Sequence, residues 1–169
     1  MLAQAVGQLK SGQSVTAPIN PAGAPVVIEL PVTAFVPTGF IADMSLRMQL
    51  YRRLADVQQE SDIDALTAEL VDRFGTLPPE LDGLLFQLRV KLLAYRAHVT
   101  AINSNDGQLS IKLPYLGEVD RAGLQRFLGE DVRVSRTGIW MSADSGDEWR
   151  GRLLRVLTRL AVNQGEPAV

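Results

Sequence analysis

AELVDRFGTLPPEL, residues 68–81, joins the end of one predicted helix to the start of the next. Gly75 tolerates the positive φ that commonly ends a helix. Proline is accepted in a first helical turn, because the N–H that it lacks would have no partner there. Pro78 and Pro79 therefore mark the start of the following helix, which the pattern extends to about His98. The stretch predicts a compact helix–turn–helix corner.

Two carboxylates, Glu69 and Asp72, lie in the predicted last turn of the first of these helices. The negative end of the helix dipole disfavours acidic side chains there, by about 0.3 to 1 kcal/mol each. The two residues are three positions apart, so they share one face of the helix. Two explanations stay open: a basic partner surface offsets the penalty, or arginines of this chain, such as Arg73, do so.

Hydrophobic spacing predicts the helices that lead up to this corner. Residues 43–58 form one, with Asp43 as its cap. Its apolar stripe is expected to contain Leu46, Leu50, Leu54 and Val57, widened by Met44, Met48 and Tyr51. The helix that ends at Gly75 is expected to begin at Ser61, which forms a weak variant of a capping box with Asp64. Its buried side chains are expected to be Ile63, Leu66, Leu70 and Phe74.

The second half of the chain predicts two β-hairpins. Residues 99–103 and 108–114 alternate in polarity around the turn sequence SNDG at 104–107, which strongly favours a hairpin. Residues 131–135 and 138–142 alternate around a second turn in the same way. These four segments predict a small, mainly antiparallel sheet.

The remaining segments complete the predicted fold class. Residues 26–30 and 32–37 read as extended segments bounded by proline, which favours a sheet edge or a peripheral strand. A short helix is expected over about 119–128 and a long one over about 147–163. The sequence therefore predicts an α+β fold, with amphipathic helices packed on the small sheet.

Composition sets the limits on domain organisation and compartment. The chain has 169 residues, of which 46% are hydrophobic, so residues 26–169 are expected to form one domain with its own core. Residues 11–25 are rich in proline, glycine and serine, which is linker composition. No apolar stretch approaches the length of a membrane span, the N-terminal residues lack the pattern of a signal peptide, and the chain has no cysteine. We expect a soluble, cytoplasmic protein that makes no contact with a membrane.

No catalytic constellation emerges from the sequence. His98 is the one histidine, and nothing ties a particular serine to it as a nucleophile. Residues 143–148, ADSGDE, lack the spacing of a calcium-binding loop and fit a turn followed by a helix cap. The chain also contains no phosphate-binding G-x-x-x-x-G-K-[ST] loop. We expect no catalytic, cofactor-binding or metal-binding residues in this chain.

Charge is unevenly distributed along the sequence. Between Asp56 and Asp82 there are eight acidic residues and one basic residue, Arg73, which suits docking to a basic protein surface. An acidic face kept for solubility is the plainer alternative. A second hypothesis starts from Arg152, Arg155 and Arg159, which follow one face of the last helix near Trp149. It interprets the chain as a nucleic-acid-binding module that uses this basic face.

A family resemblance lies in one succession of motifs, LPVTAFVPTGFIADMSLRMQLYRRLADVQQESDIDALTAELVDRFGTLPPELDGLL, residues 30–85. It resembles the start of the C-terminal domain of the bacterial transcription-repair-coupling factor (Mfd) family. The family pattern has an extended entry segment, then Asp before a helix with R-[LM]-x-[LF]-Y-[RK]-R, then E-L-x-D-R-[FY]-G-x-[LF]-P. The hairpins and the arginine-bearing last helix follow the family order more loosely, over about residues 26–163. Residues 1–12 resemble the end of the preceding translocase module.

The resemblance implies a regulatory role in DNA repair. Members of this family are ATP-dependent DNA translocases that displace stalled RNA polymerase and recruit UvrA in nucleotide excision repair. The ATP- and Mg-using motor, the polymerase-binding module and the UvrB-like module all precede this region of the protein. The resemblance implies that residues 26–169 form the C-terminal regulatory domain, which docks on the UvrB-like module and masks its UvrA-binding surface. It also implies that Glu69 and Asp72 contact basic residues of that module.

Overall fold

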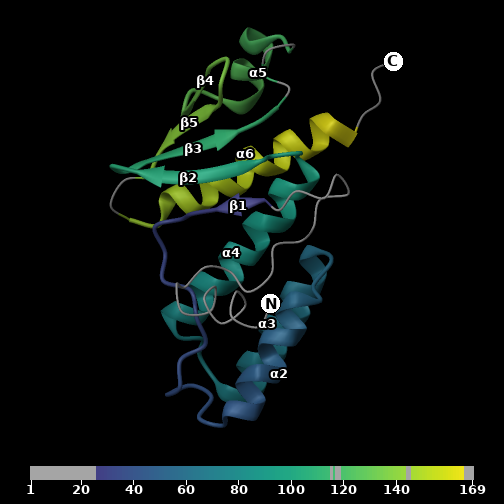
Figure 1. Cartoon of the computed structure of the whole chain (residues 1–169), viewed down its shortest axis with the longest axis vertical. Coiled ribbons are helices and arrows are strands. Elements are labelled where there is room, and N and C mark those ends of the chain that lie inside the picture. The colour runs from purple at the N-terminus through teal and green to yellow at the C-terminus, as the bar shows by residue number, and fades with distance from the viewer. Residues whose placement is uncertain (1–25, 115, 117–118, 144–145, 166–169) are drawn as a thin grey trace, which may run out of the picture. The chain divides into compact units, whose positions relative to one another are not determined.

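A computed structural model describes residues 26–114, 116, 119–143 and 146–165. The predicted linker at residues 11–25 and the segment that resembles the end of the translocase module, residues 1–12, lie outside these described residues. The described part of the chain forms two compact units, residues 31–92 and residues 26–30 together with those from 93 onward. In the described residues there are five helices and a five-stranded, mostly antiparallel sheet, which confirms the α+β class (Figure 1).

The first unit is built from helices α2 (Met44–Ala55), α3 (Glu60–Phe74) and the greater part of α4 (Pro79–Arg96). A single cluster of buried apolar side chains joins these helices to the segment that precedes them. Its fully or nearly fully buried members include Ile41, Leu50, Leu54, Ile63, Leu66, Leu70, Leu81 and Leu85. Phe74 packs on the edge of this cluster with its ring centroid 5.5 Å from that of Phe40. The predicted burial of the α3 stripe is confirmed for its three aliphatic residues, whereas Phe74 is half-buried.

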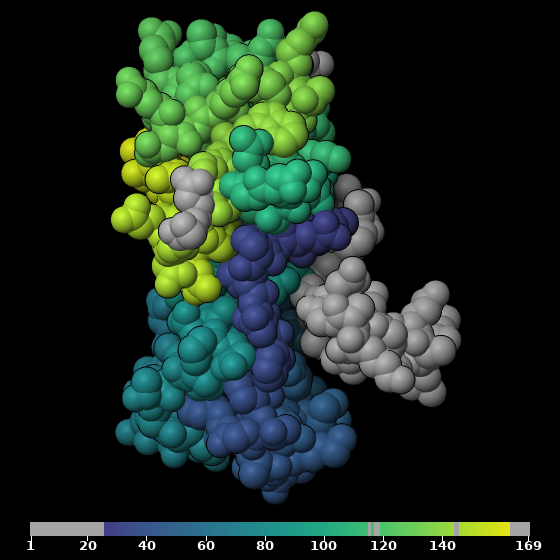
Figure 2. Space-filling view, turned by 90° about the vertical axis from the view of Figure 1, so that its left-hand side faces the viewer, coloured from purple at the N-terminus to yellow at the C-terminus, as the bar shows by residue number. Residues whose placement is uncertain are grey.

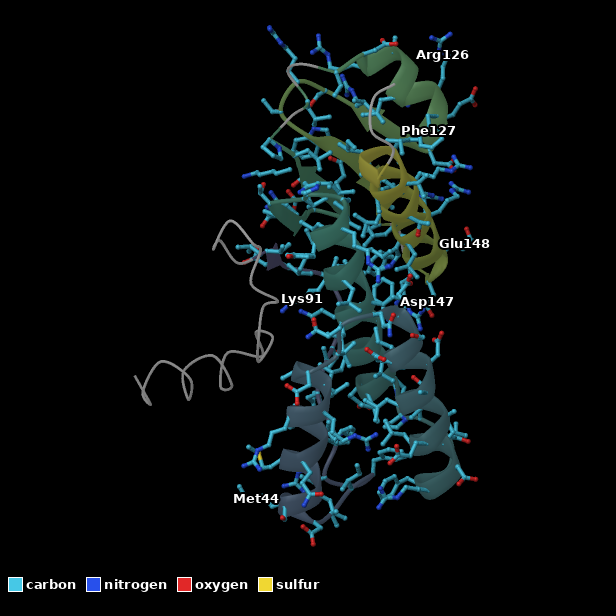
Figure 3. All side chains as sticks on the ribbon, turned by 90° about the vertical axis from the view of Figure 1, so that its right-hand side faces the viewer. Met44, Lys91, Arg126, Phe127, Asp147 and Glu148 are labelled. Carbon is cyan, nitrogen blue, oxygen red and sulfur yellow. The ribbon has the colours of Figure 1, made fainter. Side chains whose placement is uncertain are left out.

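The predicted apolar stripe of α2 is too wide. Leu50, Leu54 and Val57 are buried, but Met44 is 69% exposed and Met48 is 39% exposed. The Met44 side chain extends away from the ribbon at the start of the helix (Figure 3). Leu46 is also exposed. A short helix that contacts its neighbours along one side buries a narrow stripe, and hydrophobic spacing alone does not give the width of that stripe.

The corner between α3 and α4 forms as predicted. Gly75 ends α3 with φ of 90°, and its N–H donates to the carbonyl oxygen of Val71. The start of α3 differs from the prediction. The helix begins at Glu60, and the capping box is formed by Gln59 and Asp62 instead of Ser61 and Asp64. The Asp62 carboxylate accepts hydrogen bonds from the N–H groups of Gln58 and Gln59, so the helix is capped two residues earlier than the Ser61–Asp64 spacing indicates.

Residues 32–37 do not form a strand, contrary to the prediction. This extended segment instead runs along α4 in the first unit, where the N–H of Phe35 donates to the carbonyl oxygen of Glu80 at 3.2 Å. Gly83 of α4 lies so close to the carbonyl oxygen of Thr33 that a Cβ atom there would overlap it. The hydroxyl of Tyr51 accepts a hydrogen bond from the N–H of Val36 at 2.9 Å. The segment is thus tied to helices, and its backbone groups are used there instead of in a sheet.

The second unit contains the sheet. Its strands are β1 (Val27–Ile28), β2 (Ala101–Asn105), β3 (Gln108–Lys112), β4 (Val132–Val134) and β5 (Ile139–Ser142), in the spatial order β1-β2-β3-β5-β4. Both predicted hairpins, β2–β3 and β4–β5, are confirmed. β1 pairs with β2 in parallel and makes the sheet mixed, whereas every other pairing is antiparallel.

Helices α5 (Arg121–Leu128) and α6 (Glu148–Gly165) belong to the same unit as the sheet. One face of the sheet carries buried apolar residues, among them Ile102, Leu109, Ile111, Ile139 and Met141. The predicted stripe of α6 is buried at Leu153, Val156, Leu157 and Leu160 and half-buried at Leu154 and Ala161. The other face of the sheet is polar and open, and some of its strands reach the surface on the side shown in Figure 2.

Candidate functional site

Three acidic side chains of the acidic stretch, those of Asp62, Glu69 and Asp72, lie on one face of α3. Asp62, Ala65, Glu69 and Asp72 follow one another at intervals of three, four and three residues, which places them on a single line along the helix. We call these four residues the acidic face. Beside it, residues of α2, α3 and the loop between them line an open hollow of about 460 Å³. The residues that line this hollow are Arg53, Asp56, Val57, Asp62, Ala65, Leu66 and Glu69.

Glu69 is held by two arginines of its own unit. The guanidinium of Arg53 donates to both carboxylate oxygens, at 2.8 and 2.7 Å, and Arg73 donates to one of them at 3.3 Å. This two-point geometry is the strong form of a charge-assisted hydrogen bond. The hydrogen bond from Arg53 is the main cause that lowers the pKa of Glu69 to about 2. The side chain still keeps 36% of its surface exposed.

Asp72 differs from Glu69 in its surroundings. It is exposed, and the described residues provide no hydrogen-bond or ion-pair partner for its carboxylate. Val71, immediately before it, is 45% exposed. The last turn of α3 therefore presents an uncompensated carboxylate beside an apolar side chain, both open to solvent.

Other acidic residues of the same stretch are compensated within the first unit. Arg89 of α4 pairs with Asp64 at 2.6 Å and with Glu60 at 3.4 Å. Asp62 accepts hydrogen bonds from the backbone N–H groups of Gln58 and Gln59, both at 3.1 Å. Arg53 and Arg89, which flank the acidic stretch in the sequence, thus lie beside it in the folded unit. The surface is less strongly dipolar than the sequence indicates.

Sequence reasoning did not identify Arg53 as part of this site. It lies 16 residues before Glu69, on a different helix, so no helical spacing rule connects the two. The available signal is the short loop between the helices, because a connection of a few residues makes neighbouring helices antiparallel and brings the end of one beside the body of the next.

Comparison with known proteins places the chain in a family. Residues 30–123, more than half of the chain, match the TRCF domain. The chain belongs to the TRCF domain family. The match contains α2, α3 and α4 with the acidic face, and it extends through the first hairpin into α5.

Several transcription-repair-coupling factors are similar to this TRCF domain over part of their length. The Rickettsia conorii protein is 34% identical over 85 residues, which is 50% of this chain and 8% of that protein. The Escherichia coli protein is 28% identical over 106 residues, or 63% of this chain and 9% of that protein. The Buchnera aphidicola protein is 26% identical over 136 residues, or 79% of this chain and 16% of that protein. The chain thus spans less than a fifth of the length of these relatives.

A solved structure has a similar fold. It is a crystal structure of the C-terminal domain of transcription-repair coupling factor, with a TM-score of 0.64 and 14% sequence identity. The similarity covers 83% of this chain and 94% of that one. The architecture of the TRCF domain is therefore shared even where the sequences have diverged.

The arginines of α6 are engaged inside the second unit of the TRCF domain. Arg155 pairs with Asp131 at 2.6 Å, and Arg152 donates to the carbonyl oxygen of Ser142 at 3.4 Å. Arg159 donates to the last carbonyl groups of α5, at Phe127 and Leu128, and lies over the Phe127 ring. These contacts hold the three side chains against their own unit, and the charge of Arg155 is paired, which argues against the hypothesis that α6 offers a free basic face to nucleic acid.

The described part of the chain shows no catalytic or metal-binding arrangement around the residues that the sequence analysis considered for chemistry. His98 is exposed and follows α4 with a positive φ of 59°. Within the same described residues there is no group of three or more His, Cys, Asp and Glu side chains that could hold a metal ion. None of the helices described is long and apolar enough to span a membrane. The calcium-loop-like stretch at 143–148 lies partly outside the described residues.

Proposed function

We propose that this TRCF domain is a regulatory protein-interaction domain of a DNA translocase ATPase that acts in transcription-coupled nucleotide excision repair. It docks on the UvrB-like module of the same protein, masks the UvrA-binding surface of that module and performs no catalysis itself. Membership of the TRCF domain family supports this proposal, together with the acidic face of α3. ATP, Mg and DNA are bound by the motor of the longer protein, and RNA polymerase and UvrA act on this domain indirectly.

Asp72 is the observation that carries the proposal. An aspartate in the last turn of a helix is destabilising unless a positive charge approaches it. The described residues supply no such charge to Asp72, whereas they supply two to Glu69. A basic side chain of the docking partner, arginine or lysine, would supply it, and the exposed Val71 would be covered in the same contact.

Glu69 then has a different part in docking from Asp72. Both of its carboxylate oxygens already accept hydrogen bonds from Arg53, so a partner arginine would have to displace that side chain or add to the pair from the outside. The Arg53–Glu69 pair carries little net charge, which lowers its pull on a basic partner. We propose that Asp72 makes the direct contact and that Glu69 fixes the local charge arrangement beside it.

Docking of this kind is regulated by population. The domain is docked in the resting protein and released in the active one, so each contact shifts the balance by its differential energy. Charge pairs suit such a contact, because they give specificity without a very stable interface. A coupling of this type changes the affinity of the second partner by roughly 5- to 150-fold.

The test compares charge reversals in the full-length protein. We expect Asp72→Arg to raise the affinity for UvrA by about fivefold or more, measured by surface plasmon resonance, because the masking domain is released. Glu69→Arg should have a smaller effect. Glu148→Arg is the matched control, since Glu148 is an exposed carboxylate of α6 in the second unit (Figure 3).

The outcome that contradicts the proposal is equally specific. Equal UvrA affinity for the wild type and for Asp72→Arg, with unchanged circular dichroism, would remove the acidic face from the masking interface. A rise in affinity that the Glu148→Arg control reproduces would show a nonspecific effect of net charge instead.

A further inference from the structure

The open face of the sheet carries a row of polar and aromatic side chains in register. Asn103 of β2 pairs with Ser110 of β3, Ser110 pairs with Trp140 of β5, and Trp140 pairs with Arg133 of β4. We call these four residues the sheet row. Neighbouring strands lie about 4.8 Å apart, so the row spans roughly 14 Å across four strands.

The side chains of the sheet row are available for a ligand. Trp140 is 40% exposed, Arg133 is exposed, and Asn103 and Ser110 are half-buried. No described residue makes a side-chain hydrogen bond or ion pair with any of the four. This contrasts with the α6 arginines, all of which have partners in the same unit.

A hollow lies over the end of the sheet row at β4 and β5. It is open, has a volume of about 640 Å³ and is lined by residues that include Arg133, Ser135, Thr137, Trp140 and Ser142. Its walls are mostly polar. An enclosed apolar pocket is the usual environment of a small hydrophobic ligand, so this hollow suits a ligand that is itself polar and extended.

The charge on this face favours an anionic ligand. Lys112 and Arg133 are exposed there, since Lys112 alternates with the buried Ile111 and so faces the same side as Ser110. Glu130 and Asp131 also line the hollow, but Asp131 is neutralised by its pair with Arg155 at 2.6 Å. Glu130 remains as the one described carboxylate of the hollow without such a pair.

We propose that the sheet row is a binding site for single-stranded nucleic acid. The ring of Trp140 would stack on a base, as aromatic side chains on open sheets do in other nucleic-acid-binding folds. Arg133 and Lys112 would neutralise phosphates, and Ser110 and Asn103 would offer hydrogen bonds to base edges. Nucleic acid is preferred to a protein partner because the exposed cations Arg133 and Lys112 match phosphates while Trp140 matches the face of a base.

This site is distinct from the proposed docking surface. The acidic face belongs to the first unit and the sheet row to the second, and they have opposite charge preferences. The two proposals can therefore fail independently.

The experiment is a fluorescence anisotropy titration of the full 169-residue chain. The probes are labelled oligodeoxythymidylate and oligouridylate of about ten nucleotides and a DNA duplex of the same length. We expect saturable binding to at least one single strand, with weaker binding to the duplex, and the two single-stranded probes distinguish DNA from RNA. The logarithm of affinity should fall with the logarithm of salt concentration with a slope of about −1.4, since two phosphates are neutralised.

Variants assign the binding to the row. Trp140→Val keeps a strand-forming residue and should lose about tenfold or more in affinity, whereas Trp140→Tyr should retain most of it. Arg133→Ala should make the salt slope shallower by about 0.7, and Glu130→Gln should tighten binding. Arg126→Ala removes an exposed arginine of α5 and serves as the control (Figure 3).

Two results would overturn the proposal. One is the absence of saturable binding to either single strand up to about 0.1 mM protein. The other is wild-type affinity in Trp140→Val. If Trp140→Val does not fold, the salt slope of Arg133→Ala decides in its place, since an unchanged slope removes the row from the binding site.

Discussion

Arg53 holds both carboxylate oxygens of Glu69, with N–O distances of 2.8 and 2.7 Å, and so joins the last turn of α2 to α3. The two residues are 16 positions apart, and both are partly exposed. The sequence placed Glu69 in the last turn of α3, but the helix continues five residues beyond it, so the pair compensates this carboxylate away from the end of the helix. Its consequence for stability depends on pH.

We expect the pair to lose its stabilising effect in acid. Arg53 lowers the pKa of Glu69 to about 2 in the folded protein, against an ordinary value of 4.5. The unfolded chain therefore binds a proton more readily, and the contribution is fully present above pH 4.5 and lost as the pH falls through about 2. Urea unfolding of the wild type and of Glu69→Gln should give curves of stability against pH that converge across this window. A constant difference down to pH 2 would contradict the assignment.

Asp72 should be unfavourable for the isolated domain. Because no described positive charge compensates it at the end of α3, Asp72→Lys should raise the free energy of unfolding by about 0.3 to 1 kcal/mol. Thermal unfolding measures this change. Asp64→Lys provides the contrast, since Asp64 pairs with Arg89 at 2.6 Å and its reversal should destabilise the domain. If Asp72→Lys also destabilises, Asp72 has a structural role within the domain.

Local chemistry made some parts of this fold predictable. Gly75 and the two prolines that follow define the corner between α3 and α4 within a few residues, so the prediction needed no information from distant parts of the chain. The turn at Asp106–Gly107 fixes the first hairpin in the same way. The family resemblance carried by residues 30–85 supplied what periodicity could not, namely membership of the TRCF domain family.

Features that depend on packing between elements were not predictable. The exposure of Met44 and Met48 depends on how wide a strip of α2 its neighbours cover. The extended path of residues 32–37 along α4 depends on Gly83, which lies in the middle of a helix with no turn requirement. In the candidate site, Glu69 and Asp72 look equivalent by sequence. They differ because Arg53 approaches one and not the other.

Gly83 should be intolerant of any side chain. A Cβ atom there would overlap the carbonyl oxygen of Thr33, which is backbone and cannot swing aside. We expect Gly83→Ala to lower the free energy of unfolding by about 1 to 3 kcal/mol.

Gly151→Ala is the matched control, because Gly151 also lies in a helix and a Cβ atom there meets nothing within 4 Å. That change should stabilise the domain by about 0.5 to 1 kcal/mol, measured by the same urea unfolding. Equal effects of the two substitutions would contradict the close approach.

Gln125 of α5 completes the edge of the sheet. Its amide nitrogen donates to the carbonyl oxygens of Gly129 and Val132, at 2.8 and 2.6 Å, and its amide oxygen accepts from the N–H of Val134 at 2.8 Å. The side chain thus forms hydrogen bonds with backbone groups of the edge strand β4 that would otherwise lack a partner. We expect Gln125→Leu to cost about 1 to 3 kcal/mol.

Hydrogen exchange locates the effect of Gln125→Leu. The Val134 amide should exchange much faster in the variant, whereas the amides of β5, which lies between β3 and β4, serve as the internal reference. Unchanged protection at Val134 would show that another group satisfies this edge.

Because of Lys91, the free energy of unfolding should increase as the pH rises above about 8. Its side chain is 2% exposed, and burial lowers its pKa to about 8 from an ordinary value of 10.5. Below pH 8 the folded protein keeps this buried side chain charged, which burial disfavours. Between about pH 8 and 10.5 the folded state loses this proton before the unfolded chain does, so the stability of the wild type increases.

Lys91→Met lacks this titration. The difference in unfolding free energy between the variant and the wild type should therefore shift in favour of the wild type by about 3 kcal/mol across that window. Urea unfolding at pH 7.5 and pH 10.5 measures the shift, and parallel pH profiles for the two proteins would show that Lys91 keeps an ordinary pKa in the folded state.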